Sequence, residues 1–209
     1  MSHPLSVRRP ALADMIATTR PLTRMASNVA LVAAGVALVS VLAKVSFFIG
    51  PIPITGQTLA VITVGAVLGS RRGAASLATY LLIGLAGAPI FAGPVAGPAY
   101  VLAPSFGFVL GFIPAAFVAG WFAERAWDRM PWLAFVGFVA ASVVPFVFGL
   151  PYMALILGPV QGNAVTVTSI LAVGVVPFII PGLIKAAVAA LLIPGAWLLV
   201  RATGRTSGG

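Results

Sequence analysis

The chain has 209 residues, of which 61% are hydrophobic and 7% are charged, and its formal net charge is +9. A soluble domain of this length could not keep such a composition in solution, so the composition predicts an integral membrane protein. Its long apolar runs lack the period-2 alternation of an outer-membrane barrel, which favours membrane-spanning helices. The absence of cysteine excludes disulfides, thiolate metal sites and thiol catalysis.

The first 26 residues are basic and comparatively polar. No apolar core of the secretory kind separates their arginines, so we predict a cytoplasmic tail over residues 1–26 and not a cleaved signal. The only histidine, His3, lies in this tail. A lone histidine in a tail is not expected to hold a ligand, and we predict no metal site.

Six apolar segments follow, at residues 27–49, 57–69, 74–87, 105–122, 131–157 and 180–200. They predict an all-α, polytopic membrane protein with a single six-helix domain over residues 27–200 and a second cytoplasmic tail over 201–209. A further apolar stretch, residues 165–176, would reach only about 18 Å as a helix against a hydrocarbon core of about 30 Å. We therefore do not expect this stretch to cross the membrane alone.

Small residues and helix-breaking residues mark four features along these segments. Ala30, Ala33, Ala34 and Ala37 form a flat strip that packs either within the chain or against another protein. The proline-rich residues 51–57 predict a structured turn, because proline lacks an amide donor and restricts its predecessor. Residues 88–104 form a long uncharged loop, which is either a lid or binding loop or a passive connector. The pattern Gly107-x-x-x-Gly111 suits close packing of helices.

Basic residues fall on one side of the predicted membrane domain. Ten of the twelve lysines and arginines lie in the two tails and the even-numbered connections, whereas the odd-numbered connections hold none. The positive-inside rule then predicts six spans with both termini in the cytoplasm. The same distribution accounts for the net charge through topology and contact with membrane lipid, so we expect no nucleic-acid partner.

The remaining two basic residues, Lys44 and Lys185, lie inside predicted spans near the outer side. For Lys44 we favour a side chain that reaches the outer headgroups. Around Lys185 the sequence is apolar, and Pro181-Gly182 is expected to begin its helix. The unpaired amides and positive dipole end of a helix start, together with the ammonium group, would form an anion site.

Several chemistries are missing from the chain. Neither lysine lies in a phosphate-binding loop, so the chain is not expected to use ATP itself. The predicted spans contain no aspartate, glutamate or histidine, which argues against intramembrane proteolysis and carboxylate proton relays. We expect a binding or transport protein for an anion or neutral solute, without a cofactor, and not an enzyme.

Four ordered motifs resemble one family. They are PITGQTL at residues 53–59, LGSRRGA at 68–74, YLLIGLAGAPIFAG at 80–93 and PSFGFVLGF at 104–112. Together they are similar to the biotin-specific substrate-binding subunit of energy-coupling factor transporters, the BioY family, over about residues 27–200. The resemblance implies a six-helix protein of the bacterial inner membrane that captures biotin at its outer face for an ATP-driven transporter. Its implied partners are a transmembrane coupling protein and two cytoplasmic ATPases, with Ala30, Ala34 and Ala37 as the docking strip.

The resemblance also suggests where biotin binds. A site for biotin needs one cation for the carboxylate, amide or hydroxyl partners for the ureido ring, and apolar walls. The candidate residues are Lys185, Gln57, Thr55, Tyr80, Phe91, Gly93, Tyr100, Ser105 and Phe108.

The chain departs from the family pattern at two places. Gly182 stands where the family usually carries an aspartate, so either another acceptor, such as Gln57 or Asn163, takes its place or the ligand binds in a different position. Phe106 and Phe108 replace a glycine and a tyrosine. Two other functions remain open: a stand-alone secondary carrier or facilitator for a small carboxylate, and a structural scaffold.

Overall fold

The computed structural model describes residues 9–15, 21–48 and 51–202. The elements in chain order are η1 (Leu12–Met15), α1 (Pro21–Lys44), β1 (Ser46–Phe48), β2 (Pro53–Thr55), α2 (Gln57–Leu68), α3 (Ser70–Leu85), η2 (Pro98–Leu102), α4 (Phe106–Ala123), η3 (Trp127–Arg129), α5 (Pro131–Leu155), η4 (Ile156–Val160), α6 (Val167–Gly174) and α7 (Val176–Ala202). The prediction of an all-α fold is confirmed, with one short antiparallel hairpin, β1–β2, added to it.

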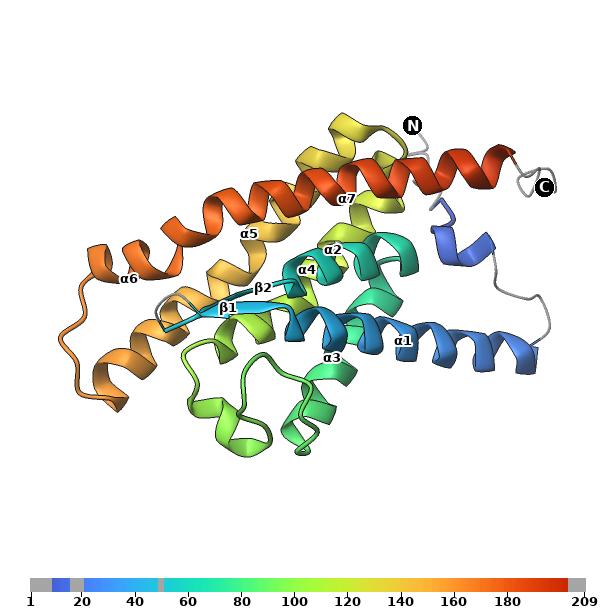
Figure 1. Cartoon of the computed structure of the whole chain (residues 1–209). Helices are drawn as coiled ribbons and strands as arrows, with labels where there is room; N and C mark the ends of the chain where they lie inside the picture. Colours follow the sequence, from blue (N-terminus) through green and yellow to red (C-terminus); the bar gives the residue numbers. More distant parts are fainter. Residues whose placement is uncertain (1–8, 16–20, 49–50, 203–209) are drawn as a thin grey trace, which may run out of the picture.

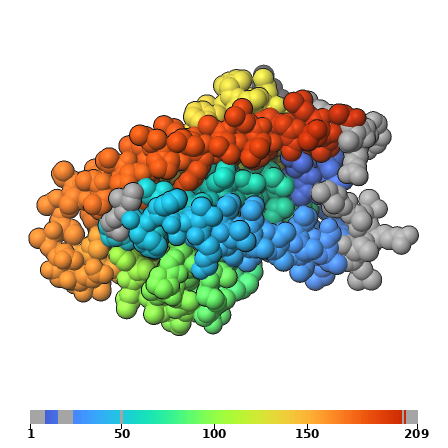
Figure 2. Space-filling view, in the orientation of Figure 1, coloured from blue at the N-terminus to red at the C-terminus, as the bar shows by residue number. Residues whose placement is uncertain are grey.

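Helix α2 occupies the middle of the molecule. It packs against α1, α3, α4 and α7, and α1 and α7 run along one face with α2 visible between them (Figures 1 and 2). Segment η1 and the C-terminal end of α7 lie at the same end of the molecule (Figure 1). The β1–β2 hairpin follows the C-terminal end of α1, at the opposite end of that helix from η1 (Figure 1).

Four helical segments are long and apolar enough to cross a membrane by themselves, at Arg24–Lys44, Phe106–Ala123, Pro131–Val160 and Val167–Val200. Helices α2 and α3 are shorter, with 12 and 16 residues, or about 18 and 24 Å. The chain is thus a multi-pass membrane protein. The count of six spans and the side of the termini stay predictions.

Three helix boundaries differ from the predicted ones. Helix α1 ends at Lys44 and not near residue 49, because the chain turns there into the hairpin. Helix α3 begins at Ser70 and not at residue 74, so Arg71 lies in its first turn. The turn before α3 consists of Gly69 alone, whose φ of +83° is strained for any other residue. The predicted tail boundary at residue 26 falls inside α1, and His3 lies outside the described residues.

Glycines let the central helices approach closely. A Cβ atom at Gly111 would lie 2.6 Å from Cα of Pro145 on α5, and one at Gly107 would collide with Tyr152 on the same helix. The expectation that Gly107-x-x-x-Gly111 packs against another helix is therefore confirmed, with α5 as the neighbour. Gly65 on α2 meets the backbone of Ala116 on α4 in the same way.

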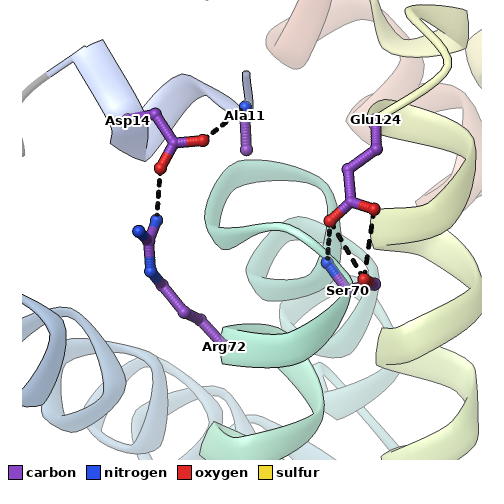
Figure 3. Close-up of polar contacts among 5 residues, drawn as sticks. All are labelled: Ala11, Asp14, Ser70, Arg72 and Glu124. Atoms are coloured by element: carbon purple, nitrogen blue, oxygen red, sulfur yellow. Dashed lines mark hydrogen bonds and ion pairs between the residues drawn. The ribbon is translucent and has the colours of Figure 1, made fainter. Parts of the chain in front are cut away.

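Buried acidic side chains join the elements at the other end. Glu124, at the end of α4, accepts hydrogen bonds from the Ser70 amide (2.8 Å) and the Ser70 hydroxyl (2.9 Å), and so caps α3 from a distant part of the chain (Figure 3). Asp14 in η1 forms an ion pair with Arg72 at 2.7 Å. Asp128 accepts a hydrogen bond from the Trp197 indole on α7. The Asp14–Arg72 pair and a hydrogen bond of 3.1 Å from the Arg9 amide to the Glu124 carbonyl hold residues 9–15, which we call the N-terminal strap, against the helix ends.

Candidate functional site

A hydrogen-bonded chain starts where the hairpin meets α2. The Thr55 hydroxyl accepts a hydrogen bond from the backbone amide of Gln57 (3.1 Å) and donates one to the side-chain oxygen of Gln57 (3.0 Å). The Gln57 side-chain nitrogen donates to the Tyr80 hydroxyl (2.8 Å), which in turn donates to the carbonyl of Ile90 (3.0 Å). Thr55, Gln57 and Tyr80 are all buried. The side-chain amide of Gln57 is therefore fixed in one orientation, because its oxygen and its nitrogen each have a partner.

Aromatic rings extend from Tyr80 across the loop that follows α3. Phe91 meets Tyr80 edge-on at 5.4 Å and stacks on Tyr100 at 4.0 Å between centroids. A Cβ at Gly84 would collide with the Phe91 ring, so this glycine lets the loop fold onto α3. Residues 86–105 are thus a packed segment, and its Tyr100 ring lies at the same cavity as Gln57, the first residue of α2.

The Tyr100 hydroxyl shares a hydrogen bond of 3.1 Å with Ser105. Burial raises the pKa of Tyr100, while the hydrogen bond to Ser105 acts in the opposite direction. The phenol stays protonated at neutral pH and keeps a proton that it can donate.

Lys185 reaches this region from α7. Its ammonium group donates to the carbonyl of Thr55 at 2.6 Å and the residue is partly buried. The expectation that Pro181-Gly182 begins this helix is wrong: α7 starts at Val176 and contains Pro181 in its interior. A single residue, Val175, separates α6 from α7. Lys185 therefore does not lie at a helix start, and no helix start contributes to an anion site there. The hydrogen-bonding partner of its ammonium group is the backbone carbonyl of Thr55 in β2.

These groups surround a cavity of about 50 Å³. Its polar lining comes from Thr55, Gln57, Thr58, Ser105, Ser142 and Lys185 together with the Tyr100 ring. Its apolar lining includes Phe108 and Phe112 on α4, Phe146 on α5 and Phe178 on α7. The arrangement offers one cation, neutral donors and acceptors, and ring surfaces, which suits a solute with an anionic end and an apolar body.

The comparisons with known proteins identify the family. The model of the BioY family matches residues 13–202. The chain belongs to the BioY family. It is 34% identical over 167 residues to a probable biotin transporter BioY of Pyrococcus horikoshii, which covers 80% of this chain and 94% of that protein. It is 36% identical over 170 residues to the biotin transporter BioY of Rhizobium etli, covering 78% of this chain and 87% of the relative.

A solved structure shares the fold of this BioY chain. It is the S-component for biotin from an ECF-type ABC transporter, with a TM-score of 0.68 and 21% sequence identity, covering 91% of this chain and 97% of that one. Homologues of this chain are therefore named as transporters, and the all-α membrane fold is that of such an S-component.

The structure of this BioY member brings most of the candidate residues together. Thr55, Gln57, Tyr100, Ser105, Phe108 and Lys185 line the cavity. Tyr80 and Phe91 lie behind it, where they hold Gln57 and Tyr100. Gly93 is not among the lining residues. With a φ of +82° it turns the loop near Phe48, so its place in the structure is that of a turn residue.

Sequence reasoning missed the contribution of α5 and of the start of α7. Ser142, Phe146 and Phe178 line the cavity. The same three residues also line an apolar cavity of about 300 Å³ between α5 and α7 that reaches Gly182. The only sequence signal was Ser142, an isolated hydroxyl in an apolar segment, and it bonds its own helix at the Phe138 carbonyl.

Three further residues differ in their relation to the cavity. Asn163, considered as a substitute acceptor, is exposed, donates to the Leu157 carbonyl at 2.9 Å and does not line the cavity. Lys44 is exposed and donates to the Phe91 carbonyl at 2.9 Å, so its partner is the protein backbone. Phe106 packs between Tyr100 and Tyr152, outside the lining.

The alanine strip lies on a free face of α1. Ala30, Ala34 and Ala37 are all exposed in this chain. Of the two interpretations of the strip, packing within the chain does not hold for these three side chains, and they stay candidates for contact with another protein.

Proposed function

We propose that this chain captures biotin at the outer face of the bacterial inner membrane, as the substrate-binding subunit of an energy-coupling factor transporter. The observation that carries the proposal is the meeting of Lys185 with the Thr55–Gln57 group at an aromatic cavity, in a chain of the BioY family. The ammonium group would pair with the carboxylate of biotin. The ureido ring would form hydrogen bonds with Gln57, Ser105 and Tyr100, and the phenylalanine rings of the cavity would pack against the bicycle and the valeryl chain.

Binding of a solute as large as biotin requires the cavity to expand. Its volume of about 50 Å³ is well below the about 300–1,000 Å³ of typical ligand sites. Phe146 and Phe178 form a wall shared with the apolar cavity of about 300 Å³, their centroids 6.1 Å apart. We infer that these two rings move when the solute enters, which would join the two spaces.

The role of the lysine can be tested with a matched pair of variants. Lys185→Ala should weaken biotin binding at least tenfold, about 1.4 kcal/mol, because a hydrogen bond to a charged group contributes about 1.5–3 kcal/mol. Lys44→Ala is the control, since this second lysine of the spans lies outside the cavity lining. Equilibrium binding of radiolabelled biotin to both purified variants measures the effect, and equal affinities would remove Lys185 from the site.

We further propose that a coupling protein with two ATPases supplies the energy and docks on Ala30, Ala34 and Ala37, with both termini in the cytoplasm. Ala34→Leu should spare biotin binding and prevent co-purification with the coupling protein. Ala75→Leu, at an exposed alanine on α3, should leave the complex intact. A complex that survives Ala34→Leu argues against docking at this strip, and counterflow of biotin by proteoliposomes holding this chain alone would favour a secondary carrier.

A further inference from the structure

A basic cavity of about 370 Å³ lies at the end of the molecule that carries the N-terminal strap. Four elements meet there: the strap, the start of α1, the turn between α2 and α3, and the end of α4. Its charged lining consists of Arg9, Arg24, Arg71, Arg72, Asp14 and Glu124. This cavity lies apart from the one at Lys185, and the two share no lining residue.

Both carboxylates of this cavity already have partners within the protein. Asp14 pairs with Arg72 at 2.7 Å and accepts from the Ala11 amide at 2.9 Å, and Glu124 caps Ser70 (Figure 3). Arg9, Arg24 and Arg71 are exposed and form no ion pair or side-chain hydrogen bond within the part of the chain that the structure describes. Three guanidinium groups are thus left over, and they favour an anion from outside the chain.

An apolar groove of about 450 Å³ lies between α1 and α3, and its lining on α1 begins one turn after Arg24 of the basic cavity. Asn28, Val32 and Val36 line the groove and follow Arg24 at intervals of four residues, so they lie in one row along α1. Thr79 and Ile83 line it from α3, two and three turns beyond Arg72. From Asn28 to Val36 the groove is about 12 Å long, which fits within one leaflet, half of a hydrocarbon core of about 30 Å.

Asn28 lines the groove one helical turn after Arg24, which lines the basic cavity. Its side-chain oxygen is buried and has no hydrogen-bonding partner within the described residues. A buried acceptor without a donor is costly, so this oxygen calls for a hydroxyl or amine from a ligand.

We propose that the basic cavity and the α1–α3 groove together bind one anionic phospholipid. Its phosphate lies among Arg9, Arg24 and Arg71, one acyl chain fills the groove, and a hydroxyl of its headgroup donates to the side-chain oxygen of Asn28. The groove distinguishes a lipid from a soluble phosphate, which has no apolar part. The excess of arginine distinguishes an anionic lipid from a zwitterionic one, whose ammonium group would lie beside like charges. Of the alanine strip, Ala33 lines the groove, whereas the proposed docking residues Ala30, Ala34 and Ala37 do not, so lipid binding can be tested separately from docking and from biotin.

The test compares lipids with matched acyl chains on the purified full-length protein. Native mass spectrometry should give at least tenfold tighter binding of phosphatidylglycerol than of phosphatidylcholine, about 1.4 kcal/mol. The double variant Arg24→Gln/Arg71→Gln should bring the two lipids within about twofold of each other. Arg125→Gln is the matched control, because Arg125 follows α4 at the same end, stacks over Trp121 and lines neither cavity. Retained biotin binding checks that each variant is folded.

The groove has its own variant. Val32→Trp should weaken phosphatidylglycerol binding at least fivefold by filling the space for the acyl chain, whereas Val147→Trp, at an exposed position on α5, should not. Three results would overturn the proposal: equal binding of the two lipids by the parent protein, unchanged selectivity in the double arginine variant, or displacement of the lipid by millimolar glycerol phosphate. The last result would indicate a site for soluble phosphate.

Discussion

Removal of the Tyr80 hydroxyl tests whether a fixed Gln57 amide matters for the site. In Tyr80→Phe the ring remains in its buried place, but the Gln57 nitrogen loses its acceptor and the Ile90 carbonyl loses its donor. Leaving a buried polar group unsatisfied costs about 1–3 kcal/mol, so we expect the free energy of unfolding to fall by about that much. The Gln57 side chain also becomes free to rotate, and reordering it on binding costs about 0.5–1.5 kcal/mol.

Tyr152→Phe provides the matched control for this prediction. The Tyr152 hydroxyl also donates to a backbone carbonyl, that of Val101, but at an exposed site where water can replace it. Its loss should cost less than about 1 kcal/mol. Thermal unfolding in detergent and equilibrium binding of biotin measure the two effects, and we expect Tyr80→Phe to bind about three- to tenfold more weakly. If Tyr80→Phe is no more harmful than Tyr152→Phe in either assay, the buried hydrogen-bonded chain does not organise the site.

Two glycine substitutions test packing and charge. Gly111→Leu should lower stability by about 1–3 kcal/mol or more, because a side chain there meets Pro145, whereas Gly195→Leu, where a Cβ would meet no other atom within 4 Å, should be tolerated in the same heat-stability assay. Gly182→Asp should also fold, since a Cβ at Gly182 meets nothing within 4 Å, and its carboxylate would lie three residues from Lys185, close enough to pair with it. Because the family pattern usually has an aspartate at this position, we expect Gly182→Asp to bind biotin at least as tightly as the parent; a tenfold loss of affinity would show that the introduced carboxylate competes with the carboxylate of biotin for Lys185.

Local features of the sequence were sufficient for much of the fold. Uncharged runs bounded by arginines and by glycine- or proline-rich turns predicted α2, α4 and α5 to within a few residues. The Gly107-x-x-x-Gly111 pattern predicted close helix packing because it depends on residues of one helix face. It could not indicate that α5 is the neighbour, since that choice depends on contacts between separate segments.

The start of α3 was predicted less well, because it depends on residues far away in the sequence. Glu124 caps α3 from another helix, so the start at Ser70 depends on a residue 54 positions away. The sequence pattern places Arg71 and Arg72 at the end of the preceding span, because charges usually lie outside apolar segments. In the structure Arg72 pairs with Asp14 of the strap, which allows the charge to lie in the first turn of α3.

The candidate site likewise contains residues that local sequence could predict and residues that only the packing of distant helices brings in. Thr55 and Gln57 are neighbours in sequence, and their mutual hydrogen bonds follow from the turn into α2. Ser142, Phe146 and Phe178 carry no charge and belong to no motif, so only the packing of α5 against α4 and of α7 against α5 and α2 brings them to the cavity. An apolar residue in a membrane span carries little information until its neighbours are known.

Lys185 lines the cavity, but not for the reason that the sequence suggested. Sequence reasoning assigned its anion site to a helix start at Pro181-Gly182, yet the helix continues through both residues. The ammonium group instead meets the carbonyl of Thr55, 130 positions earlier in the chain, at the edge of the cavity. A carbonyl dipole satisfies a hydrogen bond of the lysine but does not neutralise its charge, and a charge at this depth in a membrane protein favours an ionic partner. A ligand carboxylate can therefore add an interaction that the backbone does not provide.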